Sequence, residues 1–127
     1  MNNNVVGWFE IPVTNMDRAI KFYETVLDVK LTRNAFDSLD MAWFPWAEGG
    51  LGSSGSLVCN PEYYTPAVNG VLIYFTSQTG DLNDELNRVE QAGGTIAMPK
   101  TLISEEIGYM GGFFDTEGNR IALHSMK

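Results

Sequence analysis

The stretch VTNMDRAIKFY, residues 13–23, decides the fold, because an apolar strand gives way there to a helix. Asn15 is a residue type that caps helix N-termini, and Asp17 adds a carboxylate to the first turn, where the helix dipole favours negative charge. From Met16 to Leu27, apolar residues recur at three- and four-residue steps. This period predicts an amphipathic helix whose apolar side faces a sheet.

Strand-like segments surround this helix in the first half of the chain. A glycine-rich stretch, residues 49–55, indicates a loop or sharp bends before the last of them. The segment that follows, residues 61–69, contains two prolines and no clear period, so we interpret it as a linker. The predicted strands of this half cover residues 5–13, 30–36, 39–46 and 56–59.

The second half repeats the same order of elements. A helix is predicted over residues 81–92, and Gly93 and Gly94 follow it as a C-cap does. Residues 115–119, DTEGN, indicate a hairpin turn. The predicted strands cover residues 71–76, 95–102 (interrupted by Pro99), 108–114 and 120–125.

The repeat predicts two packed copies of one strand–helix–three-strand unit, an α+β fold. We expect residues 1–127 to form a single domain. Module one would cover about residues 5–60, the linker about 61–69 and module two about 70–127.

Composition excludes several classes of protein. The 127 residues are 44% hydrophobic and 19% charged, which argues against disorder. A net charge of −8 makes nucleic acid a poor partner. No apolar run is long enough for a membrane span, and the N-terminus lacks the features of a secretory signal. The single cysteine, Cys59, cannot form an internal disulfide, which suits the cytoplasm, and its apolar setting indicates a packed residue rather than a nucleophile.

Three motifs resemble those of the vicinal-oxygen-chelate superfamily of glyoxalases, bleomycin-resistance proteins and dioxygenases. Residues 13–23 resemble its first-module signature, in which an Asp or Asn precedes an A-x-x-F-Y helix. Residues 88–94, RVEQAGG, resemble the end of its second helix. Residues 115–121, DTEGNRI, resemble its D-P-x-G-N turn, with Thr116 in place of proline. The resemblance implies two βαβββ modules that form a curved mixed sheet around a cleft. It does not imply one activity, because the superfamily contains lyases, dioxygenases, epimerases, thiol transferases and antibiotic-sequestering proteins.

The resemblance also implies where a divalent ion would bind. Catalytic members hold it with His and Glu side chains from the sheet. The usual positions in the first, fifth and last strands fall on Trp8, on Val71 or Leu72, and on Ala122, and none of these side chains ligates a metal. The remaining position lies in residues 39–46, where Asp40 is the only acidic residue. We therefore predict that the standard metal site is missing and that no cofactor is bound.

Glu10 and His124 are the weak candidates for a non-standard metal site. Each lies two residues from a usual ligand position, Glu10 from Trp8 and His124 from Ala122, and so shares its face of the strand. Two ligands are too few for a tight site. A carboxylate in an apolar strand needs a partner or a polar cavity. We expect Glu10 to face a cleft, or to pair with Lys100, Arg33 or Tyr74, and we consider it as a catalytic base. The alternative for His124 is a partly exposed residue near the C-terminus.

Aromatic residues in the predicted strands give the remaining site candidates. Small-molecule clefts combine aromatic walls with a few polar groups, so we expect at least two aromatic residues in the cleft. For any single one, a place in the core or in a dimer interface is the alternative. The predicted ligand-binding residues are Trp8, Glu10, Trp43, Tyr74, Tyr109 and His124.

Three functions remain open from the sequence. The preferred one is a protein that binds or sequesters a small, partly aromatic or cationic molecule without metal. The second is a lyase or isomerase of the glyoxalase type that uses Glu10 as general base. The third is an interaction domain whose cleft is filled by Trp8 and Trp43. We also expect a homodimer, in which modules pair across a two-fold axis.

Overall fold

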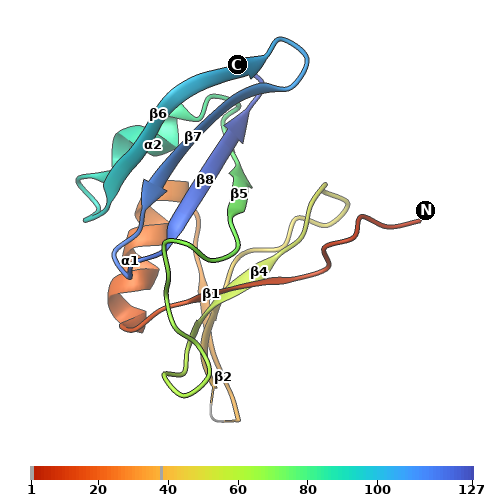
Figure 1. Ribbon diagram of the computed structural model, residues 1–127. Coiled ribbons are helices and arrows are strands. Elements are labelled where there is room, and N and C mark those ends of the chain that lie inside the picture. Colours follow the sequence, from red (N-terminus) through yellow and green to blue (C-terminus); the bar gives the residue numbers. More distant parts are fainter. Residues whose placement is uncertain (1, 38) are drawn as a thin grey trace.

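The computed structural model describes residues 2–37 and 39–127 and confirms the α+β class with two βαβββ modules (Figure 1). Within these residues, module one contains β1 (Phe9–Pro12), α1 (Met16–Leu27), β2 (Thr32–Phe36), β3 (Leu39–Trp43) and β4 (Gly55–Cys59). Module two contains β5 (Ile73–Thr76), α2 (Asn83–Val89), β6 (Thr95–Ser104), β7 (Gly108–Phe114) and β8 (Arg120–Ser125).

Each module has a four-stranded mixed sheet. The strand orders are β1-β4-β3-β2 and β5-β8-β7-β6, and in each sheet the first strand runs parallel to its neighbour. Leu57 and Ala42 face α1, because both belong to its core cluster. Since strand side chains alternate, Ser56 and its register partners Glu10 and Trp43 lie on the opposite face. The face of each sheet that points away from its helix is called its outer face below.

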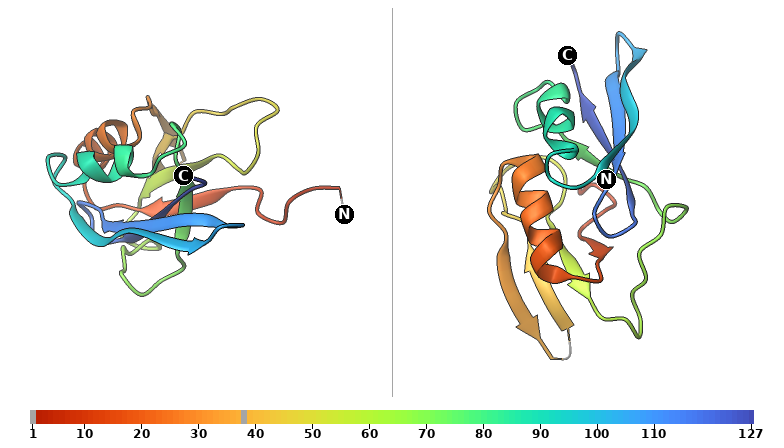
Figure 2. Two further views of the ribbon diagram at one scale, coloured as in Figure 1. Left: turned by 90° about the horizontal axis from the view of Figure 1, so that it is seen from above. Right: turned by 90° about the vertical axis from the view of Figure 1, so that its left-hand side faces the viewer.

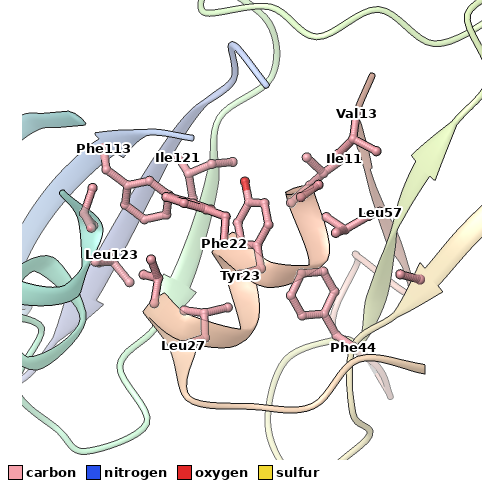
Figure 3. Close-up of a cluster of buried hydrophobic side chains, with 14 of the residues drawn as sticks. Ile11, Val13, Phe22, Tyr23, Leu27, Phe44, Leu57, Phe113, Ile121 and Leu123 are labelled. Carbon is pink, nitrogen blue, oxygen red and sulfur yellow. The ribbon is translucent and has the colours of Figure 1, made fainter. Parts of the chain in front are cut away.

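The core lies between the two modules, with α1 at its centre. Figure 3 shows Phe22 and Tyr23 of α1 between Ile11 and Leu57 of module one and the side chains of module two. Phe22 and Tyr23 are fully buried, and the ring of Phe22 lies 5.6 Å from that of Phe113. The two helices also pack side by side (Figure 2). Burial of one helix between two sheets makes the modules depend on each other for their hydrophobic stabilisation.

The cap and the apolar stripe of α1 are confirmed. The Asn15 side chain accepts a hydrogen bond from the Arg18 backbone N–H at 3.0 Å. Asp17 lies in the first turn, and the helix ends before Asp28, which has φ 54°. The buried side chains are those of Met16, Ala19, Phe22, Tyr23, Val26 and Leu27.

Three strands begin later than the sequence predicts, and one of them is β2, which begins at Thr32 rather than Lys30. β1 begins at Phe9 rather than Val5, and β5 begins at Ile73 rather than Val71. Val5 and Val71 are apolar but 90% and 94% exposed. β1 can extend only as far as its neighbour β4, which starts at Gly55 opposite Phe9. A strand boundary depends on a partner strand, which local composition does not reveal.

Helix α2 and strand β6 also differ from the prediction, for local reasons. Helix α2 begins at Asn83, because the Asp81 carboxylate accepts a hydrogen bond from the Asn83 N–H at 3.0 Å and forms a turn before it. It ends at Val89, whose carbonyl accepts from the Gly94 N–H at 3.0 Å. β6 continues through Pro99 as an edge strand, where a missing N–H is tolerated, although its register with β7 shifts beside that residue.

Glu117, in the turn between β7 and β8, joins module two to the start of α1. Its carboxylate accepts hydrogen bonds from the backbone N–H groups of Thr14 and Asn15, both at 2.9 Å, and from Arg18 Nε at 2.7 Å. Burial would raise the pKa of Glu117, but the hydrogen bonds from Arg18, Asn15, Thr116 and Thr14 outweigh it and lower this pKa to about 2. The carboxylate is therefore a second, inter-module cap for α1.

Asp115 and Asn119 extend this junction into the core. The Asp115 carboxylate accepts from the Tyr23 hydroxyl at 2.6 Å and from Asn119 Nδ2 at 2.9 Å. Burial, followed by the charge and hydrogen bond of Asp115, raises the pKa of Tyr23 well above its ordinary value. Asn119 also donates to the Pro12 carbonyl and accepts from the Ala67 N–H. The turn thus fixes α1, β1 and the linker relative to module two.

Within the described part of the chain, neither helix is long and apolar enough to cross a membrane.

Candidate functional site

A cavity of about 1030 Å³ lies at the junction of the two modules. Phe9 of β1, Phe44 and Phe75 of β5 meet there, with ring centroids 5.4 to 5.6 Å apart. Trp8, Trp46 and Tyr74 also line the cavity, and that this cavity is the predicted binding cleft stays a prediction. Its walls come from the N-terminal segment, β1, the loop after β3, the linker and β5.

Glu10 is the only charged side chain among the described residues that line this cavity. The rest of the lining is apolar, or polar without charge. A carboxylate without a neighbouring Lys or Arg gives the cavity a negative potential, in a chain whose net charge is already −8. Among the described lining residues the cavity thus carries a negative side chain and no positive one.

The partner of Glu10 is Tyr64, which comes from the linker. Its hydroxyl donates to Glu10 Oε1 at 2.7 Å, and this hydrogen bond raises the pKa of Tyr64. No sequence signal pointed to this pair, because the linker has no period. The prediction that Glu10 pairs with Lys100, Arg33 or Tyr74 was wrong. Lys100 pairs with Asp81, and Arg33 pairs with Asp17 and Asp40. The Tyr74 hydroxyl donates to Met110 Sδ.

Trp8 and Trp43 form an aromatic pair on the outer face of sheet one. Their ring centroids lie 5.8 Å apart in an edge-to-face arrangement, and the residues are 43% and 44% exposed. Trp43 is held in β3 between two neighbouring strands, whereas Trp8 precedes β1. Trp8 lines the cavity, whereas Trp43 is not among the described lining residues and contacts Trp8 instead, so its role in binding stays a prediction.

Ser56 is a residue that the sequence analysis did not single out, and it lies on the same face of sheet one as Glu10 and Trp43. It lies on β4 with Glu10 and Trp43 as its register partners, and it is fully buried. Among residues 2–37 and 39–127, no protein group forms a hydrogen bond with its hydroxyl. A buried serine in a strand has no recognisable sequence signal, because its lack of a partner depends on three strands.

The outer face of sheet two carries a smaller hollow of about 270 Å³. Tyr74 of β5 lies there opposite Ala122 of β8, so Tyr74 takes the register position beside the last-strand ligand position. Val71 and Leu72, where the sequence placed the strand-five ligand, precede the strand. Tyr74 lines both cavities and so joins the hollow to the inter-module site.

Tyr109 and His124 lie apart from Trp8 and Glu10. Tyr109 faces the α2 side of sheet two, and the Lys100 ammonium lies 4.6 Å from the centre of its ring. His124 is on the outer face near the end of β8, and its Nε2 lies beside the Ile107 carbonyl. Neither residue is among those that line the two cavities, so their roles in binding stay predictions.

The side chains do not fit the divalent ion that catalytic relatives hold. Trp8, Val71 or Leu72, and Ala122 stand at three of the usual positions, and Tyr74 lies beside Ala122. Asp40 faces α1, where it pairs with Arg33, which also contacts Asp17 of that helix. Within the described ranges, no three His, Cys, Asp or Glu side chains gather as metal ligands do. Any ion at this site would need a ligand set that these residues do not assemble.

Comparisons with known proteins agree with this architecture. Residues 5–123 match the family model of the Glyoxalase/Bleomycin resistance protein/Dioxygenase superfamily. No curated protein sequence gives a significant match. Many solved structures also match this chain, including the following three, all with the same fold at low identity.

The first of these structures is a glyoxalase/bleomycin resistance protein/dioxygenase domain from Frankia sp. EAN1pec, with a TM-score of 0.73 and 19% identity over 98% of both chains. A hypothetical protein from S. aureus has a TM-score of 0.71 and 21% identity, over 96% of this chain and 94% of its own. TnmS3, an antibiotic-binding protein from Streptomyces sp. CB03234, has a TM-score of 0.65 and 22% identity, over 98% of this chain and 97% of its own.

Proposed function

Because the chain belongs to the Glyoxalase/Bleomycin resistance protein/Dioxygenase superfamily, we propose that its inter-module cavity binds a small molecule without the divalent ion of the catalytic members. The ligand is a neutral or cationic compound with an aromatic part. One observation carries this proposal: the cavity of about 1030 Å³ is lined by aromatic side chains and, among the described lining residues, by one charged group, Glu10. Cavities of this size hold drug-sized molecules.

The charge of the lining selects the ligand class. Indole rings attract cations through the negative face of the ring, and Trp8 and Trp46 both line the cavity. The Glu10 carboxylate attracts the same ligands, and its second oxygen is available to accept a hydrogen bond beside Tyr64. A substrate that carries carboxylates or phosphates would meet this carboxylate with no compensating base among the described lining residues.

The binding test uses three small aromatic probes of different charge: benzamidine, benzyltrimethylammonium and benzoate. We expect both cations to bind, with Kd values near the millimolar range for ligands of this size, and benzoate not to bind. Glu10→Gln is expected to weaken both cations by roughly tenfold, the effect of losing one close charge in a partly exposed site. Titration calorimetry or ligand-observed NMR measures these affinities. Tighter binding of benzoate than of the cations would contradict the proposal.

Asp40 offers a control for long-range charge effects. It pairs with Arg33 on the opposite face of the sheet from Glu10, so Asp40→Asn removes the same formal charge without touching the cavity. We expect this variant to change the affinity of the cations by less than twofold. An equal loss in both variants would assign the effect to net charge rather than to Glu10.

The Tyr64–Glu10 hydrogen bond favours one second candidate, an isomerase or lyase in which Glu10 acts as general base. A tyrosine that donates to a carboxylate holds it in one orientation toward a bound ligand. Chemical analysis of the ligand after incubation with the protein separates the two functions, because a binding protein returns its ligand unchanged and an enzyme converts it. The open cavity supports both candidates over an interaction domain with a filled cleft.

We also propose a homodimer and a cytoplasmic location. Exposed apolar residues at the cavity rim support the dimer, since Leu51 is 99% exposed and Val5 and Val71 are nearly as exposed. A cluster of such residues commonly marks a contact surface. Sedimentation velocity tests for a mass twice the 14.1 kDa of one chain. The unpaired Cys59 supports a reducing compartment.

A further inference from the structure

The unpartnered hydroxyl of Ser56 needs a physical explanation. A buried hydroxyl without a hydrogen bond costs free energy, and such groups are rare in folded proteins. Alanine would fit the same space in β4 without this cost. The protein therefore keeps a polar atom at a place where the described residues offer it nothing to bind.

The aromatic pair lies on the same face of sheet one as this serine. In sheet one, β4 runs between β1 and β3, and adjacent strands lie about 4.8 Å apart. Trp8 extends from the β1 side and Trp43 from the β3 side, and their ring centroids are 5.8 Å apart. The two indoles consequently meet over β4. Ser56 lies on the same face of β4, in register with Trp43 and Glu10.

Trp8 is the member of this aromatic pair that can move. It precedes the first residue of β1, so its backbone lies outside the sheet, and it follows Gly7, around which there is open space. Trp43 is fixed in β3, which pairs with both β2 and β4. Rotation of the Trp8 side chain would expose Ser56 while Trp43 stays in place.

We infer that Ser56 is the floor of a ligand subsite which the Trp8 indole closes, and that this subsite takes the flat, cationic, N–H-bearing end of an aromatic ligand. The Ser56 hydroxyl accepts one N–H, the Glu10 carboxylate on the neighbouring strand accepts another, and the Trp43 ring packs against the flat group. Amidinium and guanidinium groups have this shape and charge. The inference rests on the proposed function and adds the ligand class and the residue that selects it.

Ser56→Ala gives this subsite a two-part signature. In the free protein the substitution removes an unsatisfied hydroxyl, so we expect Tm to rise by about 3 to 5 °C. In the complex it removes a hydrogen bond to a charged donor, so benzamidine should bind roughly five- to tenfold more weakly. Benzyltrimethylammonium has the same charge but no N–H, and its affinity should change by less than about twofold.

Two controls separate this result from a general effect on the fold. Ser54 is a buried serine just before β4 whose hydroxyl does have a partner, the Phe44 carbonyl at 3.1 Å, so Ser54→Ala should not raise Tm. In a Trp8→Ala background, water reaches Ser56, and adding Ser56→Ala should then change Tm by less than about 1 °C. This second control measures how strongly the effect of Ser56→Ala on Tm depends on the Trp8 side chain.

Each outcome of this experiment decides between the claims. If Ser56→Ala weakens benzamidine alone and raises Tm, the subsite is supported. If both cations bind the wild-type chain but Ser56→Ala weakens them equally or not at all, the subsite is wrong and the proposed function stands. If Ser56→Ala lowers Tm, the hydroxyl has a structural partner and the inference fails. If neither cation binds the wild-type chain, both proposals fail.

Discussion

Glu117→Ala is expected to lower the free energy of unfolding by about 3 kcal/mol, which corresponds to a fall in Tm on the order of 10 °C. The substitution leaves the backbone N–H groups of Thr14 and Asn15 and the Arg18 guanidinium without their shared acceptor. It also removes the charge by which module two caps α1. Chemical denaturation followed by circular dichroism measures the loss. The control is Glu105→Ala, an exposed glutamate in the turn between β6 and β7, for which we expect a change below about 0.5 kcal/mol.

The pH dependence of stability is an independent test of how much the Glu117 carboxylate stabilises the fold. The pKa of Glu117 is about 2 in the folded chain, against an ordinary value of 4.5. A lowered pKa means that the stabilisation is complete above about pH 4.5 and is lost as the pH falls toward about 2. The wild-type chain should therefore lose more stability between about pH 5 and pH 2.5 than Glu117→Gln does. Parallel Tm profiles for the two proteins would show that Glu117 contributes no stability of its own.

Gly55→Ala is the second substitution with a large expected effect. Gly55 opens β4 opposite Phe9, and a Cβ at this position would overlap the Phe9 carbonyl oxygen and ring. Backbone cannot yield as a flexible side chain does, so β1 would have to separate from β4. We expect a loss of about 3 kcal/mol or more, together with weaker binding of cations, because β1 carries Glu10.

A second glycine provides the control for Gly55. Gly7 lies two residues before β1, and no atom lies within 4 Å of the place that a Cβ would take there, so Gly7→Ala should change stability by less than about 0.5 kcal/mol. Thermal melts of the three proteins at one concentration compare the two substitutions directly. A Gly55→Ala chain with the Tm of the wild type would show that β1 and β4 can separate at this point without loss.

The elements whose signals are local could be predicted from the sequence. The cap at Asn15 and the apolar stripe gave α1 its correct bounds, Met16–Leu27. β7 and β8 also have their predicted bounds, because a hairpin turn at residues 115–119 sets the ends of both strands. The assignment of residues 1–127 to one domain stays a prediction, which the core shared by both modules supports.

The parts that depend on distant contacts could not be predicted. The start of β1 depends on the length of β4, which lies far along the chain from it. The residues of the cavity also depend on contacts between distant parts of the chain. Glu10 was identified because a carboxylate in an apolar strand is unusual, but its partner Tyr64 lies in a linker without a pattern. Ser56 became visible only when the sheet buried it without a hydrogen-bond partner among the described residues.

The central property proposed for the cavity is that it binds cations through Glu10 and aromatic rings and needs no metal ion. The most direct test is a benzamidine titration of the untagged protein before and after treatment with a chelator, with the metal content of both samples measured by elemental mass spectrometry. We predict the same affinity in both samples and far less than one ion per chain. About one tightly held ion per chain, with binding lost when it is removed, would contradict this proposal and make a metal-dependent enzyme the leading interpretation.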